Sequence, residues 1–114
     1  MKSKRVYTDY LEDILDAIAK VKEFIEGMTF DQFAKDDKTI FAVIRALEII
    51  GEATKHIPTN DRERYPKVPW PEMAAIRDKL IHDYFGVNIE VVWKTATDDL
   101  PKLEPQILRI IEEA

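Results

Sequence analysis

Three polar side chains that could take part in a chemical reaction lie close together in the sequence of the segment IRDKLIHDYFGV, residues 76–87. They are Arg77, His82 and Tyr84, spaced as Arg-x-x-x-x-His-x-Tyr. Histidine titrates near neutral pH and can move protons, and arginine is always charged and can bind two phosphate oxygens at once. The three residues could therefore handle a phosphate group. They could equally be solvated side chains, because a single histidine on a helix is usually structural.

A second group of polar residues lies on a helix that we expect over residues 38–56. Arg45, Glu48, Glu52 and His56 fall within a narrow sector of this helix, whereas most of its circumference is apolar. Residues three and four positions apart are neighbours on a helix surface. The sector is therefore either a solvated stripe of ion pairs or the polar lining of a cleft, and the pattern does not separate the two.

Two carboxylate–histidine pairs have the spacing i, i+4 that can place two ligands on one metal ion. They are Asp78 with His82 and Glu52 with His56. Two ligands are too few for a protein metal site, and the chain has no cysteine. We therefore expect neither a metal nor a cofactor. Asp78 is instead a candidate for the lining of the cleft, together with Arg45, Glu48 and Glu52.

The composition excludes several classes of protein. The chain has 114 residues, enough for one domain over residues 1–114, and 46% of them are hydrophobic. No run approaches the roughly 20 apolar residues that span a bilayer, so we expect a cytoplasmic protein with no membrane partner. The net charge of −5 argues against a protein that coats nucleic acid. If RNA is a substrate, a local basic cleft or a partner must bind it.

Apolar residues recur at three- and four-residue steps along most of the chain, which is typical of amphipathic helices. Residues 30–33 should form a short link, and residues 58–70 the one real loop. The pattern predicts an all-α, up-down bundle of four helices with a short fifth. We expect these helices from Thr8 as N-cap to Gly27, over residues 38–56, from Pro71 to Phe85, and from Asn88 as N-cap to Glu113, the last kinked or restarted at Pro101 and Pro105.

The wide apolar surface of the second helix suggests a partner chain. Ala42, Ile49 and Ala53 lie outside its main apolar stripe, so we expect them to be covered by another chain or by the flanking helices, and one small domain has difficulty covering such a wide surface alone. We therefore expect a homodimer.

Four segments in order resemble the HepT-like branch of the HEPN superfamily. They are ALEIIGEA at residues 46–53, WPEMAAIRD at 70–78, the motif Arg77-x-x-x-x-His82-x-Tyr84, and VWKTATDDLP at 92–101. The resemblance covers nearly the whole chain, and the three motif positions show no departure from the family pattern.

This resemblance implies a homodimeric HEPN-like helical bundle that acts as a metal-independent endoribonuclease on RNA. Such a protein is the toxin of a toxin–antitoxin pair, and its antitoxin is a small MntA-like nucleotidyltransferase. Arg77 and His82 would be the catalytic pair, and Tyr84 would be the residue that the antitoxin inactivates by AMP transfer. The alternative is a non-catalytic partner subunit of a nucleotidyltransferase, in which the same residues bind nucleotide or phosphate.

Overall fold

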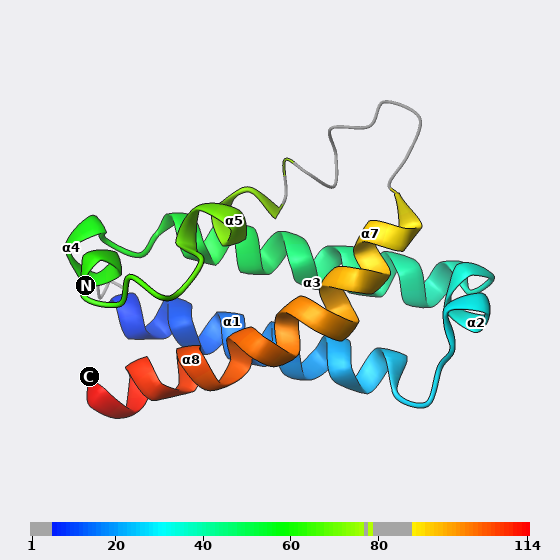
Figure 1. The fold of residues 1–114 in the computed structure, drawn as a ribbon, viewed down its shortest axis with the longest axis horizontal. Coiled ribbons are helices and arrows are strands. Elements are labelled where there is room, and N and C mark those ends of the chain that lie inside the picture. The colour runs from blue at the N-terminus through cyan, green and yellow to red at the C-terminus, as the bar shows by residue number, and fades with distance from the viewer. Residues whose placement is uncertain (1–5, 77, 79–87) are drawn as a thin grey trace, which may run out of the picture.

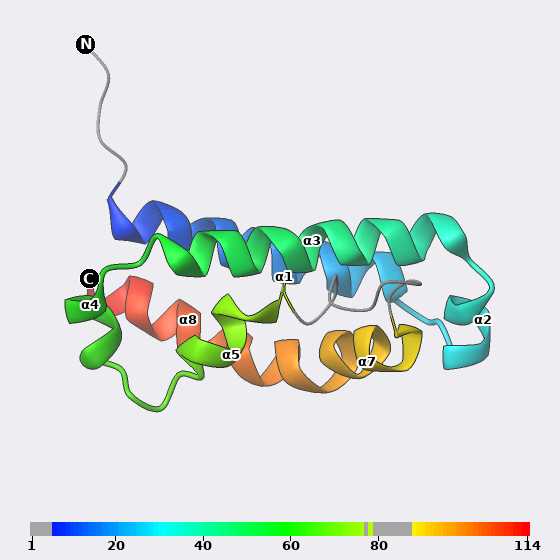
Figure 2. The same ribbon diagram turned by 90° about the horizontal axis from the view of Figure 1, so that it is seen from above.

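The computed structural model of the chain describes residues 6–76, 78 and 88–114, and within these residues all regular secondary structure is helical (Figure 1). The long helices α1 (Tyr7–Ile25) and α3 (Asp37–Lys55) are antiparallel neighbours, and α8 (Leu100–Glu113) packs against α1. This confirms the expected all-α bundle. The shorter elements between them are α2 (Phe30–Ala34), α4 (Thr59–Glu63), α5 (Trp70–Ala74), α7 (Ile89–Lys94) and the π-helical turn η1 (Thr95–Asp99) (Figure 2).

The core forms where the apolar faces of the long helices meet. Leu11 and Ile14 of α1, Leu47 and Ile50 of α3, and Ile107 of α8 are fully buried. Burying a side chain of this size stabilises the fold by about 1.5–3 kcal/mol. The periodic apolar positions of the sequence therefore account for the packing of the three long helices.

The helix ends follow local hydrogen-bonding rules with one exception. Asn88 caps α7, as predicted, because its Oδ1 accepts the amides of Glu90 at 3.0 Å and Val91 at 3.2 Å. Gly27 adopts a φ of 75° just after α1, so the predicted stop is also confirmed. Thr8 is not an N-cap, because α1 begins earlier, with Val6 at that position.

The expected cap of α1 is replaced by a neighbouring carboxylate. The Val6 amide donates to Oδ2 of Asp9 at 3.3 Å, so the side chain of the third helical residue binds back to the amide of the N-cap residue. At the start of α3, Asp36 is the N-cap, and hydrogen bonds from the Thr39 amide and hydroxyl lower the pKa of its carboxyl below 3.8.

Two segments expected to be irregular contain short helices. The link at residues 30–33 lies within α2, where Thr29 and Gln32 form a reciprocal capping box with hydrogen bonds of 2.9 and 3.2 Å. The loop at 58–70 contains α4, which starts directly after Pro58. Both predictions were wrong because a single turn is too short to show an apolar periodicity.

The third predicted helix is also interrupted. It begins one residue before Pro71, as α5, and ends at Ala74, with Ala75 in a turn. Ile76 and Asp78 are again helical. The remainder of the helix predicted to reach Phe85 lies outside the described residues.

The fourth helix changes its winding rather than breaking. A π-helical turn, η1, connects α7 to α8, and Pro101 is the second residue of α8, so the helix continues through a position that has no N–H to donate. The hydroxyl of Thr95 donates to the Val91 carbonyl at 2.9 Å, and the hydroxyl of Thr97 donates to the Trp93 carbonyl at 2.8 Å. These side-chain hydrogen bonds add to the backbone hydrogen bonds of the helix where it changes from α-helical to π-helical winding.

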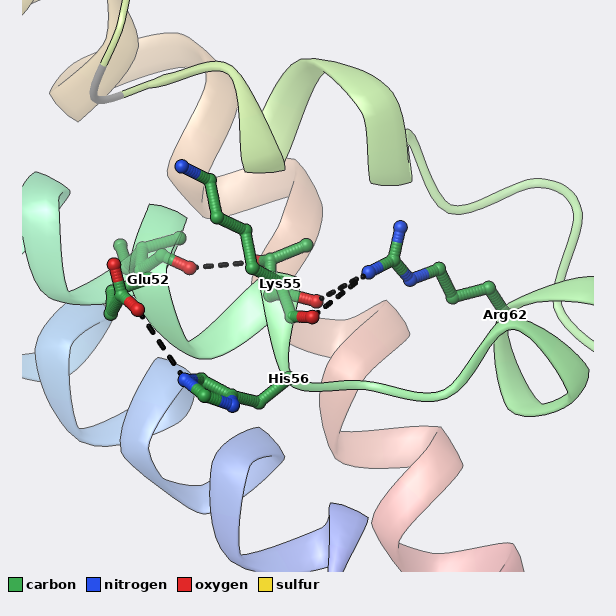
Figure 3. Close-up of polar contacts among 6 residues, drawn as sticks. Glu52, Lys55, His56 and Arg62 are labelled. Carbon is green, nitrogen blue, oxygen red and sulfur yellow. Dashed lines mark hydrogen bonds and ion pairs between the residues drawn. The ribbon is translucent and has the colours of Figure 1, made fainter.

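Arg62 of α4 caps the C-terminal end of α3 (Figure 3). Its Nε donates to the Ile57 carbonyl at 2.9 Å, and its Nη2 donates to the carbonyls of Thr54 at 3.0 Å and Lys55 at 3.4 Å. The last carbonyls of a helix have no intrahelical partner, so a forked cation here satisfies groups that would otherwise need water.

Trp70 continues this connection toward α5. Its indole N–H donates to the carbonyls of Arg62 at 3.1 Å and Tyr65 at 3.0 Å, while its ring is buried in the core. Met73 is buried one turn later and packs α5 against α3. The end of α3, α4 and the start of α5 are therefore joined through two side chains.

We predict that Arg62→Ala lowers the free energy of unfolding by about 1–3 kcal/mol, because it leaves charge-assisted acceptors without their donor. Urea denaturation measures this change. Arg64→Ala is the matched control, since the Arg64 side chain is 67% exposed and its ion pair with Asp61 spans 3.8 Å. Its loss should cost less than about 0.5 kcal/mol. Equal losses in the two variants would contradict the capping role of Arg62.

Candidate functional site

The motif residues Arg77, His82 and Tyr84 lie outside the described residues. The structure does describe how the chain reaches them. Ile76 is half-buried against the core directly after α5, and Asp78 is exposed. Because the side chains of Trp70 and Met73 are buried, α5 is anchored to the core shortly before the motif in the sequence.

A groove of about 480 Å³ lies between α1 and α3. Three of the four residues proposed as cleft lining, Arg45, Glu48 and Glu52, line this groove together. They come from successive turns of one face of α3, as their spacing indicated. Asp78, the fourth, is not among the lining residues.

The polar residues of the groove pair along the helix. Arg45 Nη1 lies 3.8 Å from Oε1 of Glu48, and His56 Nε2 lies 3.3 Å from Oε2 of Glu52 (Figure 3). Both pairs are partly or largely solvent-exposed, so each adds about 0–1 kcal/mol to stability. The sector is thus both a stripe of weak ion pairs and the wall of a groove.

The far side of the groove is formed by α1 through two residues that the sequence analysis missed. Tyr10 stacks on His56 with ring centroids 4.8 Å apart and an interplanar angle of 11°, and Asp13 also lines the groove. The start of α1 faces the end of α3 because the two helices are antiparallel. The expected antiparallel arrangement of these two helices is the feature from which the contact could have been predicted.

The apolar part of the α3 face is only partly covered. Ala53 is 5% exposed and Ala42 is half-buried, so this chain covers them at least in part. Ile49 is 36% exposed and Phe41 is 72% exposed. Ala53 is therefore covered by the flanking helices, which was one of the two possibilities expected, while covering of Ile49 by a second chain stays a prediction.

The groove combines carboxylates, one guanidinium and one imidazole. Such a set can bind a basic or hydrogen-bonding group, but it does not form a metal cage. Across residues 6–76, 78 and 88–114, no three His, Cys, Asp or Glu side chains converge on a common point. Within the same residues, no helix is both long and apolar enough to cross a membrane.

Comparison with known proteins decides the family. Residues 14–110 match the family described as ribonuclease HepT-like. The chain belongs to this family. The matched range includes all of α3, most of α1 and the whole Arg77-x-x-x-x-His82-x-Tyr84 motif, so the resemblance inferred from four short segments is confirmed.

HepT-like relatives align over most of their length. The chain is 55% identical to "Probable ribonuclease HepT" of Thermococcus cleftensis, over 89% of this chain and 92% of the relative. It is 46% identical to a "Putative RNase" of Caldanaerobacter subterraneus, over 91% of this chain and 93% of the relative. A "Putative RNase" of Methanocaldococcus jannaschii is 47% identical, with coverages of 91% and 86%. No solved structure matches the chain.

Proposed function

We propose that this protein is a metal-independent endoribonuclease and the toxin of a HepT/MntA-like toxin–antitoxin pair. The observation that carries the proposal is the match to the ribonuclease HepT-like family over residues 14–110, which includes an intact Arg77, His82 and Tyr84 motif. Relatives of 55% and 46% identity bear ribonuclease names and align with 89% and 91% of this chain.

The chemistry of the motif supports RNA cleavage without a metal. The 2′-hydroxyl of RNA attacks the adjacent phosphorus, the bond from phosphorus to the 5′-oxygen breaks, and a proton passes to the leaving oxygen. His82 supplies the group that moves protons near neutral pH, and Arg77 stabilises the charge on the phosphorane. The products are a 2′,3′-cyclic phosphate and a 5′-hydroxyl.

AMP transfer to Tyr84 is the proposed control of this activity. The tyrosine hydroxyl attacks the α-phosphorus of ATP on the nucleotidyltransferase, and pyrophosphate leaves. The added phosphodiester brings a bulky anion two residues from His82, so it would compete with RNA both electrostatically and sterically.

Assembly as a homodimer through the exposed face of α3 would complete the proposed enzyme. Arg45 and Glu52 lie equally far along the helix from the midpoint between Glu48 and Ile49. A two-fold axis at this midpoint, with antiparallel α3 helices, would bring each Arg45 to Glu52 of the partner subunit and cover Ile49. Two motifs beside one axis would also concentrate positive charge within an acidic protein.

We predict that His82→Ala and Arg77→Ala each reduce RNA cleavage by at least about 100-fold, which is the usual contribution of a general acid–base group. Growth inhibition should be lost in parallel, while circular dichroism stays unchanged. Lys38→Ala, an exposed cation at the start of α3, should cleave like the wild type. Cleavage that persists in both motif variants, or that requires added divalent metal, would contradict the mechanism. RNA binding without cleavage by the wild type would favour the non-catalytic partner subunit.

We predict that co-expression with the cognate nucleotidyltransferase adds one or more adenylates to the peptide that holds Tyr84, and that toxicity disappears. Intact and peptide mass spectrometry detect the change. Tyr84→Phe should remain toxic and gain no mass, because the acceptor hydroxyl is gone. If Tyr84→Phe is still adenylylated, the target is another tyrosine, with Tyr65, Tyr10 and Tyr7 as the candidates.

We predict that Ile49→Asp converts the dimer into a monomer, because burying an unpaired carboxylate in the interface is costly. Light scattering measures the mass. Leu108→Asp is the matched control, since Leu108 of α8 is 45% exposed and lies on a different helix face. Arg45→Glu should weaken the dimer, and adding Glu52→Arg should restore it through the reversed ion pair. A dimer of unchanged stability in Ile49→Asp and Arg45→Glu would rule out this interface.

A further inference from the structure

A second groove lies at the end of the molecule where the chain after α4 meets the C-terminal half of α8. Both figures of the fold place α4 and the end of α8 together (Figures 1 and 2). The groove has a volume of about 360 Å³. Two long-range hydrogen bonds join its walls: Tyr65 Oη donates to Oε1 of Glu113 at 3.4 Å, and Gln106 Nε2 donates to the Lys67 carbonyl at 3.2 Å.

The charge of this groove is opposite to that of the whole chain. Arg64, Lys67 and Arg109 line it, and Glu113 is the acidic residue among the lining side chains. The chain as a whole carries a net charge of −5. Three cations around one small groove create a local positive field, which attracts anions and is screened by salt.

Glu113 already occupies the position that an anion would take. Its Oε2 accepts a hydrogen bond from Arg109 Nε at 2.9 Å, and its Oε1 accepts one from the Tyr65 hydroxyl. Partial burial and the neighbouring Glu113 carboxylate raise the pKa of Tyr65 above 10.0, so its hydroxyl remains a donor at neutral pH. Arg109 and Glu113 are 78% and 47% exposed at their side chains, and an exposed pair of this kind is worth only about 0–1 kcal/mol. An incoming phosphate can therefore replace the carboxylate at small cost.

The groove also lies on a path toward the motif. Lys67 and Gln106 line both this groove and a larger one of about 640 Å³ between α5 and α8. The larger groove is lined in addition by Lys102 and by Ile76, the residue before Arg77. Glu72 and Asp99 also line the larger groove and balance its two lysines, so the net positive charge belongs to the smaller groove, and the two grooves are joined through Lys67 and Gln106.

We propose that the groove between Tyr65 and Arg109 binds a backbone phosphate of single-stranded RNA, at a distance from the cleaved bond. This inference rests on the proposed ribonuclease function and adds a subsite to it. One phosphate displaces the Glu113 carboxylate and binds to Arg109 and Tyr65. Lys67 binds a neighbouring phosphate of the same strand, on the side of the larger groove. A guanidinium next to a hydroxyl donor suits the tetrahedral oxygens of phosphate, and contacts of this kind hold the strand without reading its sequence.

The test measures RNA binding separately from cleavage. The probe is a single-stranded 2′-O-methyl oligoribonucleotide, which lacks the nucleophile and so cannot be cut. Fluorescence anisotropy at several salt concentrations gives Kd and its salt dependence. Arg109→Gln and Lys67→Gln should each raise Kd about three- to tenfold and reduce the slope of log Kd against log salt by about 0.7, the value for one phosphate contact on a single strand.

The carboxylate gives a test of opposite sign. Glu113→Gln should lower Kd about threefold, because it removes the internal competitor and leaves the cations in place. Glu112→Gln is the matched control, since it makes the same charge change at the neighbouring exposed position outside the groove. Lys38→Gln is the control for lost positive charge, because Lys38 is exposed at the start of α3, and α4 lies beyond the other end of that helix (Figure 2).

The outcomes separate this subsite from the ribonuclease proposal. If the wild type cleaves ordinary RNA, but Arg109→Gln binds the probe like Lys38→Gln, the subsite is overturned and the ribonuclease stands. The subsite is also overturned if Glu113→Gln binds no more tightly than Glu112→Gln, or if poly-glutamate outcompetes RNA with the same dependence on Arg109 and Lys67. If the wild type neither binds nor cleaves RNA, the ribonuclease proposal fails and the subsite fails with it.

Discussion

The hydrogen bonds between Arg62 and the end of α3 are the interaction on which the connection from α3 through α4 to α5 depends. A helix of nineteen residues ends here with carbonyl groups that need donors. One guanidinium reaches two of them, those of Thr54 and Lys55, as well as the Ile57 carbonyl just beyond the helix, and the backbone carbonyl of the same residue accepts the Trp70 indole N–H. Without this guanidinium the carbonyls would have to bind water, and the connection from α3 through α4 to α5 would be weaker.

The α1–α3 pair gives the molecule two faces with different properties. Its inner face is apolar and closes the core with α8. Its outer face carries Arg45, Glu52 and the Tyr10–His56 stack around the exposed Ile49. A helix this long can serve both purposes because its inner face alone supplies enough buried surface for stability, which leaves the outer face available for association.

Much of the fold could be predicted from the sequence, because long amphipathic helices repeat their pattern over several turns. The prediction for α3 was off by one residue at each end, and Asn88 was correctly identified as a cap. The single-turn helices α2 and α4 could not be found by periodicity, although the Thr29–Gln32 spacing of a capping box was present in the sequence.

The candidate sites were predictable to different degrees. The polar sector of α3 followed from helical spacing within one element, so Arg45, Glu48 and Glu52 were found together. The stack of Tyr10 on His56 and the basic groove of Arg64, Lys67 and Arg109 join residues that are far apart in the chain. Contacts of this kind depend on how helices pack and on where a loop returns, which local patterns do not encode.

The π-helical turn between α7 and α8 has a consequence for how the length of this chain can change during evolution. Val92, Ala96 and Leu100 are buried and follow one another at steps of four residues. On a regular α-helix, two such steps would rotate the buried side by about 80°. The wider turn removes much of this rotation and keeps the apolar side of α8 directed at α1. The turn thus works as a phase correction between two helices. Deleting one residue from it would leave a regular α-helix in which Val92 and Leu100 are seven residues apart, about 20° short of two full turns, so the apolar side of α8 would keep its direction while the helix becomes shorter.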